Sequence, residues 1–253
     1  MIGLALAGGP ACKKKAPPEA ESDKAPAAAQ KGPAGPSLEC PPPTTFAPLS
    51  TEKGRKLETA CVVFASGLYW LATALEYDEK TGANPALYFM SGNASGRVMV
   101  YDLKPAPTEA IQKLIQDSKR VSMQIRRTHN DNALVRLGVM GHMGEGENAD
   151  RVEVGMLLKL VAHAPPQVLW VGEGDRRVTG PDGCVEEQVI DFELLFRTRL
   201  EKFATARAYP APGNKTATCR PGPSMQDSVA FKPVSLERPR PLVPEGEAGK
   251  KPL

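Results

Sequence analysis

The sequence VSMQIR, from Val121 to Arg126, alternates apolar and polar side chains with a period of two. Successive side chains of a β-strand point to opposite faces of a sheet, so Val121, Met123 and Ile125 would share one face. This alternation is typical of an antiparallel strand with one face against a core and the other toward solvent. The stretch therefore predicts a sheet that covers a core on one side.

Similar stretches lie on both sides of it and are separated by turn-forming residues. Two of the turns predict hairpins, namely TGPDG at 179–183 and the segment 79–85, which would join 68–77 to 86–91. In the first turn a proline presets φ and a glycine is free to take a positive φ. The other strand candidates span 98–103, 134–140, 152–162, 168–171 and 191–197.

One segment predicts a helix, because Ile111, Leu114 and Ile115 fall on one helical face between residues 108 and 118. The segment 57–75 is nearly continuous in apolar residues and fits a buried helix or a long strand. Its β-branched and aromatic residues favour the strand. Together these patterns predict a mainly β protein, an antiparallel β-sandwich or barrel-like domain with one or two helices. An α+β fold is the alternative.

Proline is concentrated at the two ends of the chain. Residues 1–50 hold 10 of the 25 prolines and residues 205–253 hold 9. Such segments offer too little apolar surface to offset the entropy of ordering, so both flanks are expected to be disordered. The expected organisation is a linker at 13–50, a β-rich globular domain at 51–210 and a Pro-rich basic tail at 211–253.

The overall composition excludes several classes of protein. A net charge of +3 over 253 residues is too small for a strongly basic nucleic-acid-binding protein. Aromatic residues make up 6% of the chain, which does not favour a stacking surface for single-stranded nucleic acid. No run of about 18 apolar residues is present, so no transmembrane helix is predicted. Nucleic acid is therefore not an expected partner.

The first fifteen residues place a short stretch of small and apolar residues before Cys12, and three lysines follow it. This arrangement resembles the end of a bacterial lipoprotein signal peptide, in which a small residue such as Ala11 precedes the cysteine that becomes lipidated. Gly9 and Pro10 depart from the usual lipobox. The resemblance implies that residues 1–12 are a residual signal peptide, that Cys12 carries the lipid, and that residues 13–50 are the tether. It also implies a membrane-anchored protein of the cell envelope, facing the periplasm or the cell surface.

Four further cysteines predict two disulfides, because an even number in an exported chain is typical of oxidised pairs. Three pairings are possible, and we favour Cys40–Cys61 with Cys184–Cys219, since each would hold a Pro-rich flank to the core. None of the four lies at zinc-ligand spacing from another cysteine or a histidine, so no metal site is expected from them.

No local motif predicts a catalytic site. The segments 50–53, 80–82 and 91–93 match the three short motifs of penicillin-binding proteins and serine β-lactamases. Here, however, the K-T-G motif precedes S-x-N, whereas it comes last in that family. A serine–histidine–acid triad is assembled in space, so the histidines keep an exported hydrolase as an alternative. They are His129, His142 and His163.

Three other groups of residues have a chemical interpretation and a plainer one. Soft ligands at Met140, His142 and Met143, with Met156 and His163 as additions, make a periplasmic Cu(I)-binding module a second alternative. Two pairs of arginines could bind an anionic ligand, although such pairs more often form a solvated face. Three aromatic residues could line a groove for a sugar or a peptide, although such residues more often lie in a core. These residues are Arg126, Arg127, Arg176, Arg177, Tyr69, Trp70 and Trp170.

The leading hypothesis is a non-enzymatic envelope lipoprotein. The lipid on Cys12 would hold it to the membrane, and the β-rich domain would bind or scaffold another envelope protein or a cell-wall polymer. No cofactor is expected.

Overall fold

The chain forms two units, Met1–Pro36 and Ser37–Leu253. The first lies wholly outside the described residues, and so does Cys12. In the second, the computed structural model describes residues 39–50, 52–63, 69–93, 97–104, 106–128, 133–146, 148–161, 164–195, 199–214 and 216–242.

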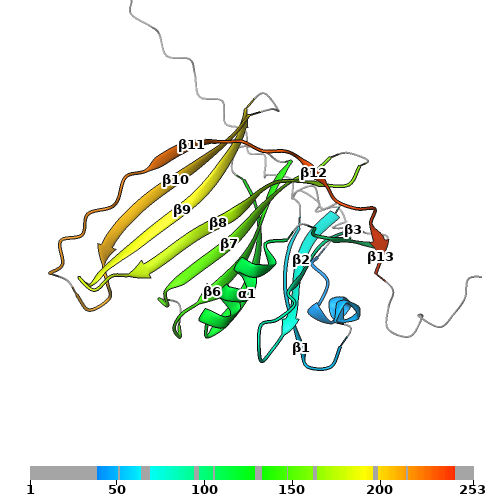
Figure 1. Cartoon of the computed structure of the whole chain (residues 1–253), viewed down its shortest axis with the longest axis horizontal. Coiled ribbons are helices and arrows are strands. Elements are labelled where there is room, and N and C mark those ends of the chain that lie inside the picture. Colours follow the sequence, from blue (N-terminus) through cyan, green and yellow to red (C-terminus); the bar gives the residue numbers. More distant parts are fainter. Residues whose placement is uncertain are drawn as a thin grey trace, which may run out of the picture. The chain divides into compact units, whose positions relative to one another are not determined.

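Two antiparallel sheets make up this unit (Figure 1). The smaller sheet has the strand order β1-β2-β3-β4-β13. Its strands are β1 (Arg55–Val63), β2 (Tyr69–Asp78), β3 (Ala86–Asn93), β4 (Val98–Asp102) and β13 (Arg240–Pro241).

The larger sheet has the order β11-β10-β9-β8-β7-β6-β5, with β12 paired to β8 beside this path. Its strands are β5 (Arg120–Arg127), β6 (Leu134–His142), β7 (Arg151–Lys159), β8 (Gln167–Thr179), β9 (Cys184–Leu195), β10 (Arg199–Pro210), β11 (Met225–Val229) and β12 (Val234–Ser235). Two helices complete the unit, the 3₁₀-helix η1 (Pro43–Leu49) and the α-helix α1 (Thr108–Asp117).

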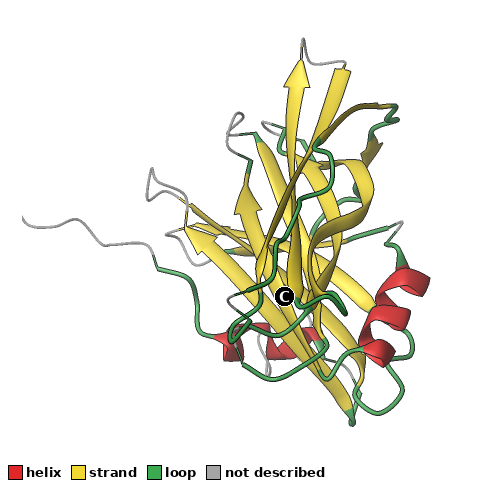
Figure 2. Cartoon of the chain, turned by 90° about the vertical axis from the view of Figure 1, so that its left-hand side faces the viewer, coloured by secondary structure: helices red, strands yellow, loops and turns green. Residues whose placement is uncertain are grey.

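The main hydrophobic core lies between the sheets. Alternate residues of β2 and of β6, such as Leu75 and Leu137, are buried together with the apolar face of α1. The strand VSMQIR contributes Val121 and Met123 to this core, as its alternation predicts. The predicted antiparallel sandwich is therefore confirmed, and the described strands do not close into a barrel. Figure 2 shows the two red helices beside the yellow sheets.

The ambiguous segment 57–75 forms parts of two neighbouring antiparallel strands, β1 and β2. Strand β2 is apolar on both faces because both faces are covered. Leu71 and Leu75 point into the main core, whereas Trp70 and Ala72 belong to a second cluster on the outer face, with Phe46 and Leu49 of η1. A central strand buried on both sides loses its alternation, which explains why the sequence alone left two possibilities.

The larger sheet opens in its middle. Strands β8 and β9 pair only between Arg176 and Thr179 on the β8 side, and toward its beginning β8 pairs with β12 instead. A third apolar cluster, which includes Leu157, Ile190 and Phe192, belongs to these diverging strands. The sequence predicted only 168–171 as strand here. It missed the length of β8 because Gly172 and Gly174 resemble turn residues.

The folded unit is wider than the predicted domain at 51–210. On the N-terminal side, Phe46 and Leu49 are each 1% exposed. On the C-terminal side, the segment assigned to a disordered tail runs from β11 past β12 to β13, shown from orange to red in Figure 1. Its strands pair with both sheets. The described parts of both flanks are therefore ordered by pairing and burial that their proline content did not reveal.

None of the helices within the described residues is long and apolar enough to cross a membrane.

Candidate binding cleft

An open cleft of about 590 Å³ lies between residues of the two sheets. Its volume falls within the range of about 300–1,000 Å³ that is usual for small-molecule sites. One wall is the inner face of β2, β3 and β4, and the other comes from the segments before β6 and between β7 and β8 of the larger sheet. The lining residues are Tyr69, Leu71, Phe89, Ser91, Gly92, Asn93, Arg97, Met99, Tyr101, Ala133, Leu160, Val161, Ala164 and Pro166.

The register of the smaller sheet arranges the first wall in rows. Phe89 pairs with Tyr101, and their ring centroids are 5.9 Å apart. The next row contains Ser91, which pairs with Leu71 on one side and with Met99 on the other. Paired residues of neighbouring strands place their side chains on the same face, so these rows present one continuous surface to the cleft.

The third row is the polar end of this wall. Tyr69 pairs with Asn93, and Gly92 pairs with Val98. Continuing that register by one residue places Arg97 opposite Asn93. Along β3 the wall therefore changes from Phe89 through Ser91 to Asn93, and Tyr69 stays beside the polar end.

The described residues of the opposite wall are all apolar. Ala133 precedes β6, and its carbonyl oxygen accepts a hydrogen bond of 2.7 Å from the backbone N–H of Leu160, just beyond β7. Val161, Ala164 and Pro166 follow in the connection to β8. Among the described lining residues, the polar end therefore belongs to the first wall.

Among the described lining residues, the cleft carries a single fixed charge. Arg97 is the one ionisable group of fixed charge among these described residues, and none of them is a carboxylate. Within the described chain, Arg97 takes part in no salt bridge. Burial raises the pKa of the Tyr101 phenol above its ordinary value, so this group stays neutral at physiological pH.

A second group of polar side chains lies on the other face of the larger sheet. Arg136 is 1% exposed and Glu153 is fully buried, and the two form a salt bridge. Arg136 also contacts Asp175 at 3.1 Å, and Arg126 contacts the other oxygen of Asp175 at 2.9 Å. We call these four residues the buried charge cluster. Two arginines and two carboxylates make it neutral as a whole.

The buried charge cluster bonds to backbone where β8 and β9 diverge. The N–H of Ile190 donates to Asp175 Oδ1 at 2.8 Å, and the carbonyl oxygen of Ile190 accepts from Arg136. Glu153 Oε2 accepts the N–H of Asp175 at 2.8 Å. These side chains therefore satisfy backbone groups that a continuous strand ladder would otherwise pair, which is a structural role.

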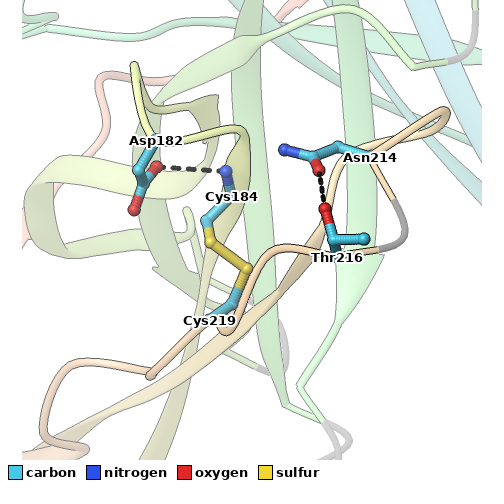
Figure 3. Close-up of a disulfide and its surroundings, with 5 residues drawn as sticks. All are labelled: Asp182, Cys184, Asn214, Thr216 and Cys219. Atoms are coloured by element: carbon cyan, nitrogen blue, oxygen red, sulfur yellow. Dashed lines mark hydrogen bonds between the residues drawn. A yellow bond between two sulfur atoms is a disulfide. The ribbon is translucent and has the colours of Figure 1, made fainter.

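The four cysteines expected to form disulfides do so in the favoured pairing. Cys40–Cys61 ties the segment before η1 to β1. Cys184–Cys219 ties the start of β9 to the segment after β10 (Figure 3). Asp182 Oδ1 accepts the backbone N–H of Cys184 at 3.0 Å in the turn that precedes this bond.

The Cu(I) ligand candidates are not brought together. Met140 and His142 pair with the polar-face residues Ser122 and Arg120 of β5. Met156 is 1% exposed in the main core, on the opposite face of the sheet. His163 lies outside the described residues. Among those that the structure does describe, no three His, Cys, Asp or Glu side chains form a metal site.

The arginine pairs and the tryptophans mostly serve the fold. Arg126 belongs to the buried charge cluster, and Arg177 donates to Tyr209 Oη at 3.2 Å and to the carbonyl oxygen of Ala149 at 3.3 Å. Trp70 packs edge-on against Phe46.

Trp170 packs against Phe192, with ring centroids 4.7 Å apart. Of the three aromatic residues considered for a groove, only Tyr69 lines the cleft.

One serine–histidine contact exists, at 2.9 Å between Ser122 Oγ and His142 Nε2. Burial lowers the pKa of His142, and the charges of Arg120 and Arg151 lower it further. The charged neighbours are thus cations, whereas a triad places a carboxylate beside the histidine. Neither residue of this contact lines the cleft, and His129 lies outside the described residues.

Two of the three β-lactamase-like motifs are also separated. Ser91 lies near the end of β3, and the K-T-G segment at 80–82 lies in the turn before this strand. Ser91 is five residue steps from the start of β3, which corresponds to about 17 Å along a strand.

Comparison of the chain with protein-family models, with curated proteins and with solved structures yields no significant match.

The cleft residues were not predicted from the sequence, apart from Tyr69. Ser91 was considered only within a catalytic motif, and Arg97 was not considered. The one available signal was the position of Asn93 and Arg97, one on each side of the turn between two mostly apolar strands. It identifies a cleft only together with the opposite wall, whose residues are distant in the sequence.

Proposed function

We propose that this protein is a membrane-tethered envelope lipoprotein whose β-rich unit binds a ligand in the cleft and catalyses no reaction. The observation that carries the binding role is the cleft itself, with its volume, its apolar walls and its polar end. The cysteine context at Cys12 supports the lipid anchor. The two disulfides support an oxidising compartment, where such bonds persist.

The lining favours a small ligand over the cell-wall polymer or envelope protein considered from the sequence. A polymer of sugars or an extended peptide would need hydrogen-bonding groups along the whole cleft. Here the polar side chains, apart from the phenols of Tyr69 and Tyr101, lie at one end, at Ser91, Asn93 and Arg97.

The anchor is tested by Cys12→Ser. This variant should leave the membrane fraction while keeping both disulfides, as judged by its mobility on gels without reducing agent. The physical reason is that an acyl anchor contributes about 0.8 kcal/mol per buried methylene. A Cys12→Ser protein that stays fully membrane-bound would overturn the tether.

The cleft is tested with an uncharged apolar fluorophore, N-phenyl-1-naphthylamine. Its fluorescence should rise on binding to the purified chain. Ala164→Trp places a bulky side chain at an exposed lining position and should abolish the rise. Ala230→Trp, an exposed alanine outside the lining, is the matched control and should leave it unchanged. Equal binding by both variants would show that the fluorophore does not use the cleft.

A further inference from the structure

The cleft is amphipathic along its length. Its first wall runs from the Phe89–Tyr101 pair, through the row of Ser91 and Met99, to the row of Asn93. Successive rows on one face of a strand are about 6.8 Å apart, so the polar end lies about 14 Å from the aromatic pair. The distance suits a ligand with an extended apolar body and one polar end.

The polar end is positively charged. Arg97 is exposed, and none of the described lining residues is a carboxylate that would compensate its charge. A guanidinium group binds a carboxylate or phosphate through two parallel hydrogen bonds, which an alcohol or an amide cannot match. Ser91, one row further in, adds a hydroxyl group beside the position of such a head group.

The described part of the C-terminal segment, which ends at residue 242, does not supply the occupant. The N–H of Leu236 donates to the carbonyl oxygen of Pro166 at 2.9 Å, and the N–H of Leu242 donates to Val98 at 3.1 Å. These bonds hold the segment to both walls, and Leu236 itself is 4% exposed in the main core. None of the described residues of this segment lines the cleft.

We propose that the cleft binds a single-chain amphiphile with an anionic head group, whose apolar chain lies between the sheets and whose head group pairs with Arg97. This inference rests on the proposed binding role of the cleft. The head group is a carboxylate, as in a fatty acid, or a phosphate monoester. Both share the chemistry that Arg97 recognises, and the experiment separates them.

The experiment displaces N-phenyl-1-naphthylamine from the full chain with four hexadecyl compounds below their micellar concentrations. The compounds are palmitate, hexadecyl phosphate, hexadecanol and hexadecyltrimethylammonium. We expect one or both anions to displace the fluorophore at concentrations at least about tenfold lower than hexadecanol, because a hydrogen-bonded charge adds about 1.5–3 kcal/mol. The cation should be the weakest. The stronger of the two anions identifies the head group.

Arg97→Gln should weaken the anions at least about tenfold while leaving hexadecanol and the fluorophore unchanged. Arg97→Lys keeps the charge but loses the paired hydrogen bonds, so it should recover only part of the affinity. Arg220→Gln removes an exposed arginine outside the cleft and should change nothing.

The outcomes separate the two proposals. If the fluorophore binds and Ala164→Trp blocks it, but Arg97→Gln leaves palmitate and hexadecyl phosphate unchanged, the head-group inference fails and the binding cleft stands. An equal preference for hexadecanol and the anions overturns it in the same way. If the fluorophore never binds in the cleft, the proposed function itself fails.

Discussion

The cleft and the buried charge cluster both place charged side chains among apolar ones. They differ in whether those charges have partners of opposite charge within the protein. Arg136 and Asp175 bond to one another and to the backbone of Ile190. Arg97, by contrast, stands at the edge of an open cavity that holds no opposite charge among its described lining. Charges that neutralise one another inside the protein serve the fold, whereas a single charge beside an apolar cavity is available to a ligand.

The same contrast separates stability from binding. Removing one partner of a buried ion pair leaves the other charge without compensation, and this is strongly destabilising. Removing an exposed charge changes stability little.

Glu153→Gln should lower the free energy of unfolding by about 3–5 kcal/mol, because Arg136 then keeps its charge in a buried site with less compensation. Denaturation in urea measures this change. Glu58→Gln breaks the partly exposed contact with Lys56 at 3.0 Å and serves as the control, with an expected loss of about 0–1 kcal/mol. Equal losses in the two variants would mean that the cluster does not hold the fold.

Gly138→Ala should destabilise by about 1–3 kcal/mol, because a methyl group at this position would collide with the carboxylate of Glu153 and overpack the cluster. Gly144→Ala is the matched control. Its added methyl group would meet Ala149 Cβ at 3.5 Å, an ordinary contact. If both alanine variants unfold at the same urea concentration, the glycine is not needed to make room for the cluster.

His142 should make stability depend on pH. Its pKa in the folded protein is lowered from 6.5, first by burial and then by Arg120 and Arg151. The stability that this group contributes is present above the unfolded pKa and is lost as the pH falls through the folded one, because the unfolded chain takes up the proton more readily.

His142→Asn should therefore lose less stability than the parent between about pH 7.5 and 5. Thermal unfolding at a series of pH values measures the two slopes. If stability changes with pH equally in the parent and in His142→Asn, the folded structure does not lower the pKa of His142.

Arg97→Gln should leave the free energy of unfolding within about 0.5 kcal/mol of the parent, the usual result for an exposed side chain. Urea denaturation without ligand gives this value. A loss near that of Glu153→Gln would place Arg97 with the structural charges and remove the contrast between the two regions.

Much of the fold could be predicted from local patterns. The alternation in VSMQIR, the turns at 179–183 and 79–85 and the apolar face of the helix at 108–118 each depend on neighbouring residues, and the structure contains all of them. The pairing of the four cysteines followed from the position of each near the border between a flank and the core. Such features are readable because the residues that determine them are close in sequence.

The boundaries and the length of β8 could not be predicted in this way. Phe46 is buried because β2 presents an apolar outer face for η1 to cover. The C-terminal segment is ordered because β8 and β4 each leave an edge with which it pairs. Gly172 and Gly174 stand within a strand because Trp170 and the buried charge cluster occupy the space beside them.

The sequence predicted most strands of the two sheets and the helix, and it favoured the cysteine pairing that the structure shows. These signals are the period of side chains along the backbone and the spacing of residues along the chain. Which charges form ion pairs within the fold, and which have no ion-pair partner among the described residues, depends on the tertiary structure. It brings Arg126 and Arg136 to Asp175, and it leaves Arg97 beside apolar walls built from segments up to 69 residues away at Pro166. The reason is that burial and charge compensation depend on distance in space, which no local pattern records.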